Sequence, residues 1–138
     1  MCTTRCCAAR IGHGLTLIKH PLLMQMVKQR GIAVEICPIS NEILGFVADL
    51  RNHPAVHYIN AGLTVVLATD DPAIMQHSLS HDFYVAFMAW GLDLRSLKQI
   101  AMNSLVYSAM NVDKKRRALA SWHQRWDGFV TWLNASAP

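Results

Sequence analysis

Apolar and polar residues come in short blocks along this chain, and the block lengths predict strands and helices in alternation. Three apolar runs are bounded by glycine, proline or aspartate and have the length of strands that are buried in a parallel sheet. They lie at Ala8–His13, Ile32–Cys37 and Leu63–Ala68. The last run is the clearest strand, because no charged residue interrupts it.

Helical spacing fills the segments between these runs. One helix is predicted from Pro21 to the residue before Gly31, and another from Pro54 to Gly62, because proline favours the first turn of a helix and glycine its end. Between them, Asn41 has the side chain of a helix N-cap. The apolar face of the first helix is assigned to Leu22, Leu23, Met26 and Val27, and that of the helix after Asn41 to Ile43, Leu44, Val47 and Leu50.

After the third strand the spacing is helical only. Helices are predicted over Ser80–Trp90, with Ser80 as the cap, over Leu94–Met110, and along a final amphipathic segment. The apolar stripe of the second is made of Leu94, Leu97, Ala101 and Leu105, and that of the last of Leu119, Trp122, Trp126, Phe129 and Leu133.

Strands that alternate with helices predict an α/β fold with a parallel sheet. Polar residues follow each strand: His13 the first, Ser40 and Asn41 the second, Asp70 and Asp71 the third. In a TIM barrel, active-site groups collect at this edge of the strands, and a complete barrel has eight βα units in roughly 250 residues. About three units followed by helices therefore predict the C-terminal part of a TIM (β/α)8 barrel, with its two outer strands unpaired.

The amino-acid composition predicts that part of the surface of this chain is covered by another segment or another molecule. Of the 138 residues, 52% are hydrophobic and only 16% are charged, whereas soluble domains carry about 25% charged residues. Together with the unpaired strands, this predicts self-association, for example as a homodimer. The longest apolar stretch is far short of the roughly 20 residues that a membrane span needs, and the first ten residues lack the apolar segment of a secretion signal.

Charge and cysteine content narrow the choice of function further. Most of the net charge of +4 lies in Lys114–Arg117, a basic run that is typical of a solvated helix face. No aromatic platform accompanies this run, so we expect no nucleic-acid binding. Cys37 stands alone in an apolar run and is expected to be buried and reduced. The other cysteines form neither a spaced disulfide framework nor a paired zinc motif; they are Cys2, Cys6 and Cys7.

Several segments resemble, in order and spacing, motifs of the adenosine deaminase family. Three of them carry the polar residues that follow the strands: Arg10–Gly14, Glu35–Asn41 and Thr69–Pro72. Three more are similar to the secreted subfamily, the adenosine deaminase-related growth factors: Asp49–Pro54, Leu79–Tyr84 and Leu97–Ser104. The resemblance implies that residues 10–138 are the C-terminal half of an adenosine deaminase-like barrel domain, that residues 1–9 are unmatched, and that the protein is extracellular.

The same resemblance implies a hydrolase that acts on purine nucleosides. In this family one zinc ion activates a water that attacks C6 of adenosine or 2′-deoxyadenosine, and ammonia leaves. Asp70 matches the family's carboxylate ligand of zinc, His13 the histidine that orients or deprotonates the zinc-bound water, and Asp71 the carboxylate that hydrogen-bonds purine N7. Taken alone, an Asp-Asp-Pro sequence after a strand is more often a turn or a helix cap, and a histidine between glycines is as often a simple loop residue.

The other histidines do not predict a second site. His53 and His57 are four residues apart, as are His77 and His81, but neither pair has the glutamate of the metalloprotease motif directly after its first histidine. We interpret His53 before Pro54 as a helix entry and the second pair as incidental. The H-x-E and P-C-x-x-C signature of nucleic-acid deaminases is absent.

The family's remaining zinc ligands are not in this sequence. The family takes them from a His-x-His and a His-Ala-Gly-Glu segment, and neither occurs here. One carboxylate cannot hold a catalytic zinc, which takes three or more protein ligands. We therefore predict that the chain is inactive by itself and that the activity belongs to a longer protein. The alternative is a non-catalytic, truncated adenosine deaminase-like protein that acts as a binding or regulatory partner.

Overall fold

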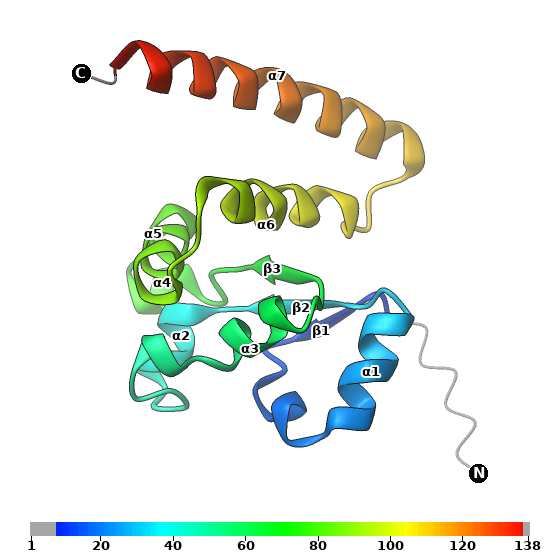
Figure 1. Ribbon diagram of the computed structural model, residues 1–138, viewed down its shortest axis with the longest axis vertical. Coiled ribbons are helices and arrows are strands. Elements are labelled where there is room, and N and C mark those ends of the chain that lie inside the picture. The colour runs from blue at the N-terminus through cyan, green and yellow to red at the C-terminus, as the bar shows by residue number, and fades with distance from the viewer. Residues whose placement is uncertain (1–7, 137–138) are drawn as a thin grey trace.

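The three predicted strands form one parallel sheet. In the computed structural model, which describes residues 8–136, the strands β1 (Arg10–Gly12), β2 (Ala33–Ile36) and β3 (Val65–Leu67) are arranged in the order β1-β2-β3 (Figure 1). Ile11 is paired with Val34, and Val34 with Val65. The predicted parallel α/β fold is confirmed, with each strand shorter than its apolar run.

Helices connect and follow the strands. Strands β1 and β2 are joined by a 3-10 helix, η1 (Leu15–Lys19), and by α1 (Pro21–Gln29). Between β2 and β3 lie α2 (Pro38–Ile43), the 3-10 helix η2 (Leu50–Asn52) and α3 (Pro54–Asn60). The elements after β3 are helical only, as predicted; they are α4 (Pro72–Met75), α5 (Leu79–Trp90), α6 (Leu94–Val106) and α7 (Val112–Ser136).

The core lies between one face of the sheet and the helices. Alternate residues of β2 and β3 point to this face, because successive side chains of a strand alternate between its two sides. Tyr58 of α3 is fully buried there, and Trp90 of α5 is 8% exposed. The cluster includes Val34, Ile36, Val65 and Leu67 from the strands and Met24, Val27, Tyr58, Ala86, Trp90 and Ile100 from the helices.

The predicted apolar face of α1 is wrong in part. Val27 is buried, but its partner in the core is Met24, three residues earlier, while Leu22 is 77% exposed. Leu23 and Met26 are exposed as well. A helix that contacts the core along one narrow line buries a single pair of residues at i and i+3. The other apolar side chains of α1 therefore remain on the surface.

The helix predicted after Asn41 begins three residues earlier. Pro38 occupies the first turn of α2, and Asn41 lies inside the helix with no exposed surface. Ile43 and Leu44, which were assigned to its inner face, are more than half exposed. The amide of Asn41 makes side-chain contacts with two histidines instead of capping the helix. Its polarity, which suggested a cap, serves the site described below.

Two of the later helices also differ in detail from their predictions. Helix α5 begins at Leu79, so Ser80 is inside it and the N-cap position belongs to Ser78. The buried residues of α6 are Ile100 and Asn103. Asn103 donates from Nδ2 to the carbonyl oxygen of Val65, 2.9 Å away. This polar contact between helix and strand could not be read from apolar spacing.

Both outer strands are open within residues 8–136. Strand β1 pairs only with β2, and so does β3, which agrees with the expected unpaired edges. Helix α7 lies along α6 and away from the sheet (Figure 1). No residue of α7 is fully buried, and Phe129 and Leu133 of its apolar stripe are each 39% exposed. Among the helices of residues 8–136, none is both long and apolar enough to cross a bilayer.

Candidate active site

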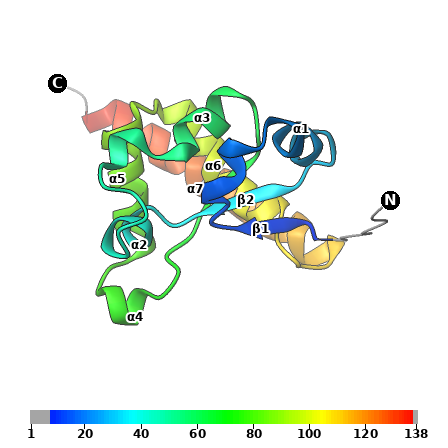
Figure 2. The ribbon, with the colours of Figure 1, turned by 90° about the horizontal axis from the view of Figure 1, so that it is seen from below.

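The polar residues that follow the three strands meet at one edge of the sheet. Parallel strands all end on the same side, and Figure 2 shows α2 and α4, the helices that directly follow β2 and β3, at that common end. His13 comes directly after β1, Ser40 lies in the first turns of α2, and Asp70 follows β3. The site is therefore built from three separate connections between strands and helices.

The loop after β1 presents His13 from an unusual backbone conformation. His13 and Gly14 both have positive φ angles, 53° and 61°, a region that only glycine adopts at little cost. The hydroxyl of Tyr58 donates to the carbonyl oxygen of Gly14 at 2.7 Å and accepts from the backbone N–H of Ile18 at 3.0 Å. With these two hydrogen bonds, the buried Tyr58 holds the loop between Gly14 and Ile18 in place.

Gly14→Ala is expected to lower the free energy of unfolding by about 2–5 kcal/mol. The left-handed conformation costs an alanine roughly 1–2 kcal/mol, and a Cβ at this position would lie 2.7 Å from Cγ1 of Val34, an overlap that adds roughly 1–3 kcal/mol. Urea unfolding of the two proteins measures the difference. Gly31→Ala is the matched control, because Gly31 has the same φ of 61° with nothing within 4 Å of a new Cβ. Equal losses in the two variants would contradict a close packing of Gly14 against β2.

The second connection contributes two fully buried polar side chains. Proline at the first turn of α2 starts the helix directly after β2, which turns Ser40 and Asn41 toward the sheet edge. Ser40 donates from Oγ to Oδ2 of Asp70 at 2.7 Å. Nδ2 of Asn41 lies 3.0 Å from Nδ1 of His13. Each side chain thus orients one of the residues singled out in the sequence.

Asp70 and His13 face each other. Oδ2 of Asp70 is 3.7 Å from Nε2 of His13, and each side chain is about one third exposed. Asp70 also has a positive φ, 61°, which aspartate tolerates better than most residues. Two of the three non-glycine residues with positive φ in residues 8–136 are therefore at this site, where backbone strain tends to collect.

Asp71 has a different environment. It occupies the N-cap position of α4 without a side-chain hydrogen bond to that helix, and it is exposed. No hydrogen bond or ion pair joins it to His13 or Asp70 within the described residues. The structure therefore brings two of the three predicted site residues into contact, and leaves the third beside them with a free carboxylate.

Asp82 and His77 form a buried pair behind the site. Nε2 of His77 lies 2.9 Å from Oδ2 of Asp82, with both side chains almost fully buried. Oδ1 of Asp82 accepts from the backbone N–H of Ile39 in α2 at 3.3 Å, and burial raises the pKa of this carboxyl. Our interpretation of His77 and His81 as incidental is thus incomplete, because His77, in the loop between α4 and α5, is buried against Asp82 in the first turn of α5.

Cys37 behaves as predicted. It is 4% exposed and free, and burial, with the nearby charge of Asp70 second, raises the pKa of its thiol to about 12. A neutral buried thiol is a weak nucleophile. Cys2, Cys6 and Cys7 lie outside the described residues.

The described residues do not complete a zinc site. Within residues 8–136, no three His, Cys, Asp or Glu side chains converge where a metal ion could bind, and catalytic zinc takes three or more protein ligands. Asp70 fits as one such ligand, because its carboxylate is about one third exposed beside the end of β3 and accepts a hydrogen bond from Ser40. The hydrogen bond from Ser40 is of the kind that orients a metal-ligating carboxylate.

A parallel α/β sheet with polar side chains at the carboxyl ends of its strands is the arrangement that a TIM barrel has at its active site. The family profile described as adenosine deaminase matches residues 1–124. The chain is 47% identical to adenosine deaminase 2 of Sus scrofa over 130 residues, 91% of this chain and 26% of that protein. It is also 47% identical to the adenosine deaminase of Phlebotomus duboscqi over 126 residues, 88% of this chain and 24% of that protein.

A solved structure shares the fold. An amidohydrolase from Burkholderia ambifaria with bound zinc superimposes with a TM-score of 0.81 at 25% identity, covering 93% of this chain and 36% of the other. The chain therefore belongs to the adenosine deaminase family, with relatives named adenosine deaminase 2, and its sheet is part of a TIM barrel. It spans about a quarter of the length of the curated relatives that it matches.

Three residues behind the site were not predicted from the sequence. His53 was interpreted only as the entry to α3, and it does cap that helix, because its Nδ1 accepts from the backbone N–H of Ala55. Its other ring nitrogen contacts Asn41. Tyr58 and Asp82 act on the site through backbone atoms. No spacing in the sequence connects these residues, since each lies at least 12 positions from its partner at the site.

Proposed function

We propose that this chain carries the C-terminal half, residues 10–138, of the catalytic domain of a zinc-dependent adenosine aminohydrolase. The observation that carries the proposal is the contact of His13 and Ser40 with Asp70 at the carboxyl edge of the sheet, in a member of the adenosine deaminase family. The substrate class is a purine nucleoside, adenosine or 2′-deoxyadenosine. Localisation outside the cell is part of the proposal and rests on resemblance to the secreted subfamily.

The residues have distinct roles in this proposal. Asp70 is one ligand of a zinc ion whose other ligands lie in the remainder of the longer protein; bound zinc makes hydroxide available near neutral pH. His13 faces the carboxylate of Asp70 from the end of β1, on the other side of β2, and orients the attacking water. Asp71 holds purine N7, for which its free, exposed carboxylate is suited. Ser40 orients the carboxylate of Asp70 through its hydrogen bond to Oδ2.

A chimera with a full-length relative tests this function. In the chimera, the aligned residues of this chain replace the matching segment of Sus scrofa adenosine deaminase 2, to which they are 47% identical. We expect the purified chimera to bind one zinc and to convert adenosine into inosine, followed by the change in absorbance. A folded, zinc-loaded chimera without turnover would refute the proposed function.

The chain alone is expected to form no inosine, even with added zinc, and to bind zinc with less than one-to-one stoichiometry. The reason is the incomplete ligand set of the described residues. Elemental analysis after dialysis measures the metal. Turnover by the chain alone would mean that copies of it assemble a complete site.

The unpaired edges favour one other candidate, a binding or regulatory partner without catalytic activity. Strands β1 and β3 each have a side without a partner in the described residues, and open edges promote pairing with another chain. Under this reading the chimera would be inactive, whereas the chain alone would form a defined complex with a copy of itself. Sizing chromatography of the chain at micromolar concentration distinguishes a defined dimer from a monomer.

A further inference from the structure

A chain of hydrogen bonds with a fixed direction leads from the backbone of α3 to His13. It begins at the N–H of Ala55, which lies 2.9 Å from Nδ1 of His53. A backbone N–H can only donate, so Nδ1 of His53 must accept and carries no proton. Burial lowers the pKa of His53 to about 4, so the ring is neutral at physiological pH and its single proton is on Nε2.

The next link fixes the orientation of an amide. Nε2 of His53 lies 3.0 Å from Oδ1 of Asn41, and as a donor it requires the oxygen of the amide on its side. The opposite orientation would place the NH2 group against an N–H. The NH2 group of Asn41 must therefore point to His13, where its nitrogen lies 3.0 Å from Nδ1.

The last link determines the tautomer of His13. Because the NH2 group of Asn41 only donates, Nδ1 of His13 accepts. A neutral imidazole then has its one proton on Nε2, the nitrogen that faces Oδ2 of Asp70 at 3.7 Å. We propose that Asn41 and His53 are positioning residues that hold neutral His13 in its Nε2-protonated tautomer, so that His13 acts at the site as a hydrogen-bond donor and not as a base.

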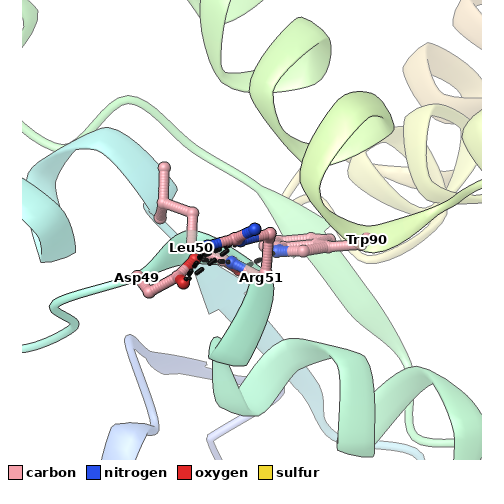
Figure 3. Close-up of polar contacts among 4 residues, drawn as sticks. All are labelled: Asp49, Leu50, Arg51 and Trp90. Atoms are coloured by element: carbon pink, nitrogen blue, oxygen red, sulfur yellow. Dashed lines mark hydrogen bonds and ion pairs between the residues drawn. The ribbon is translucent and has the colours of Figure 1, made fainter.

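The surroundings of the relay make it rigid. His53 is 1% exposed and Asn41 is fully buried, so water cannot replace either partner. The ring of Trp90 packs against His53 with centroids 5.3 Å apart. Trp90 also donates from Nε1 to the carbonyl oxygen of Leu50 at 2.9 Å, in the turn that Asp49 and Arg51 close by their ion pair (Figure 3).

The tautomer of His13 decides between two roles that the sequence leaves open. A histidine that deprotonates water needs a free electron pair on Nε2, and that would move its proton to Nδ1, against the NH2 group of Asn41. A protonated Nε2 instead donates to an oxygen, which orients a water and stabilises negative charge that develops beside it. This consequence rests on the proposed function, whereas the tautomer itself does not.

Solid-state NMR of the chain tests the tautomer directly. Spectra of the sedimented chain, labelled with 15N and 13C at histidine and held near pH 9, where ordinary histidines with a pKa of about 6.5 are neutral, distinguish the two tautomers in any association state. The signals of His13 are those lost in a His13→Gln variant. We expect a protonated Nε2 and a bare Nδ1 at both His13 and His53. A protonated Nδ1 at His13 would overturn the proposal.

Asn41→Asp replaces the NH2 group that faces His13 by an oxygen and leaves the shape of the side chain unchanged. A carboxylate accepts from His53 as the amide oxygen does, but it cannot donate to His13, so the proton of His13 is expected to move to Nδ1. Asn60→Asp, the same change at an exposed position on α3, should leave His13 as it is. An unchanged His13 tautomer in Asn41→Asp would show that the relay does not control it.

A second readout uses the chimera. There Asn41→Asp should lower kcat by about 10–100-fold, the usual effect of losing an orienting partner, with little change in KM. A loss confined to thermal stability would reduce Asn41 to a structural role and overturn the positioning role. If the chimera without this substitution is inactive, the proposed function fails, while the NMR result still decides the tautomer.

Discussion

Asp70→Ala is expected to reduce kcat/KM of the chimera for adenosine by about 10³-fold or more. In the proposed function the carboxylate of Asp70 is a ligand of the zinc ion, and the charge stabilisation of a bound metal is worth several kcal/mol, of which each 1.36 kcal/mol is a factor of ten in rate. The variant should also lose its zinc on dialysis. Steady-state kinetics together with metal analysis measure both effects.

Two further substitutions make this result specific. Asp113→Ala removes a carboxylate that is 75% exposed on α7 and forms an ion pair with Arg116, and it should leave the activity unchanged. Ser40→Ala removes the hydrogen bond to Oδ2 of Asp70 and should reduce zinc affinity by about 10–100-fold, as expected of a residue that orients a ligand. An Asp70→Ala chimera that keeps more than a tenth of its activity would remove Asp70 from the metal site.

The stability of the chain is expected to fall by about 3 kcal/mol between pH 6.5 and pH 4 through His53 alone. Burial lowers the pKa of His53 from 6.5 to about 4 in the folded state. Between these values the unfolded chain binds a proton that the folded chain does not, so acid favours unfolding. The contribution of His53 is fully present above about pH 6.5 and is lost as the pH falls toward 4. The magnitude follows from 1.36 kcal/mol per unit of pKa difference.

A His53→Gln variant isolates this effect. Urea unfolding at several pH values gives the slope of stability against pH for both proteins, and the variant should lack the His53 part of the slope, whatever its absolute stability. Asp82 acts in the opposite direction, because its raised pKa adds stability at low pH that is lost as the pH rises. That contribution is common to both proteins and cancels in the difference. Parallel slopes would mean that His53 is already accessible to protons in the folded chain.

Apolar runs and turn residues predicted the elements well. Each predicted strand exists, because short apolar runs that end in glycine, proline or aspartate have few alternatives in an α/β chain. Prolines at positions 21 and 54 open helices as expected. The helix faces were predicted less well, as in α1, because its four neighbouring apolar residues fit more than one stripe and only contact with the sheet selects Met24 and Val27.

The residues of the site, too, could be predicted from the sequence only in part. His13 and Asp70 could be selected because each closes a strand, and parallel strands carry their ends to one edge. His53 could not, because the same residue caps a helix and orients Asn41, and only the first role is visible in its neighbour Pro54. Asp82 resembled an ordinary helical acid until folding buried it against His77.

Local patterns and motifs in order were enough to predict the parallel α/β fold, the edge of the sheet where polar residues gather and the resemblance to adenosine deaminases. Which nitrogen of His13 faces Asp70, and which residues fix it, could be seen only in the folded chain. Hydrogen-bond direction is passed from Ala55 through His53 and Asn41 to His13, across a distance of 42 positions in the chain. That direction exists only once the partners are packed together and shielded from water.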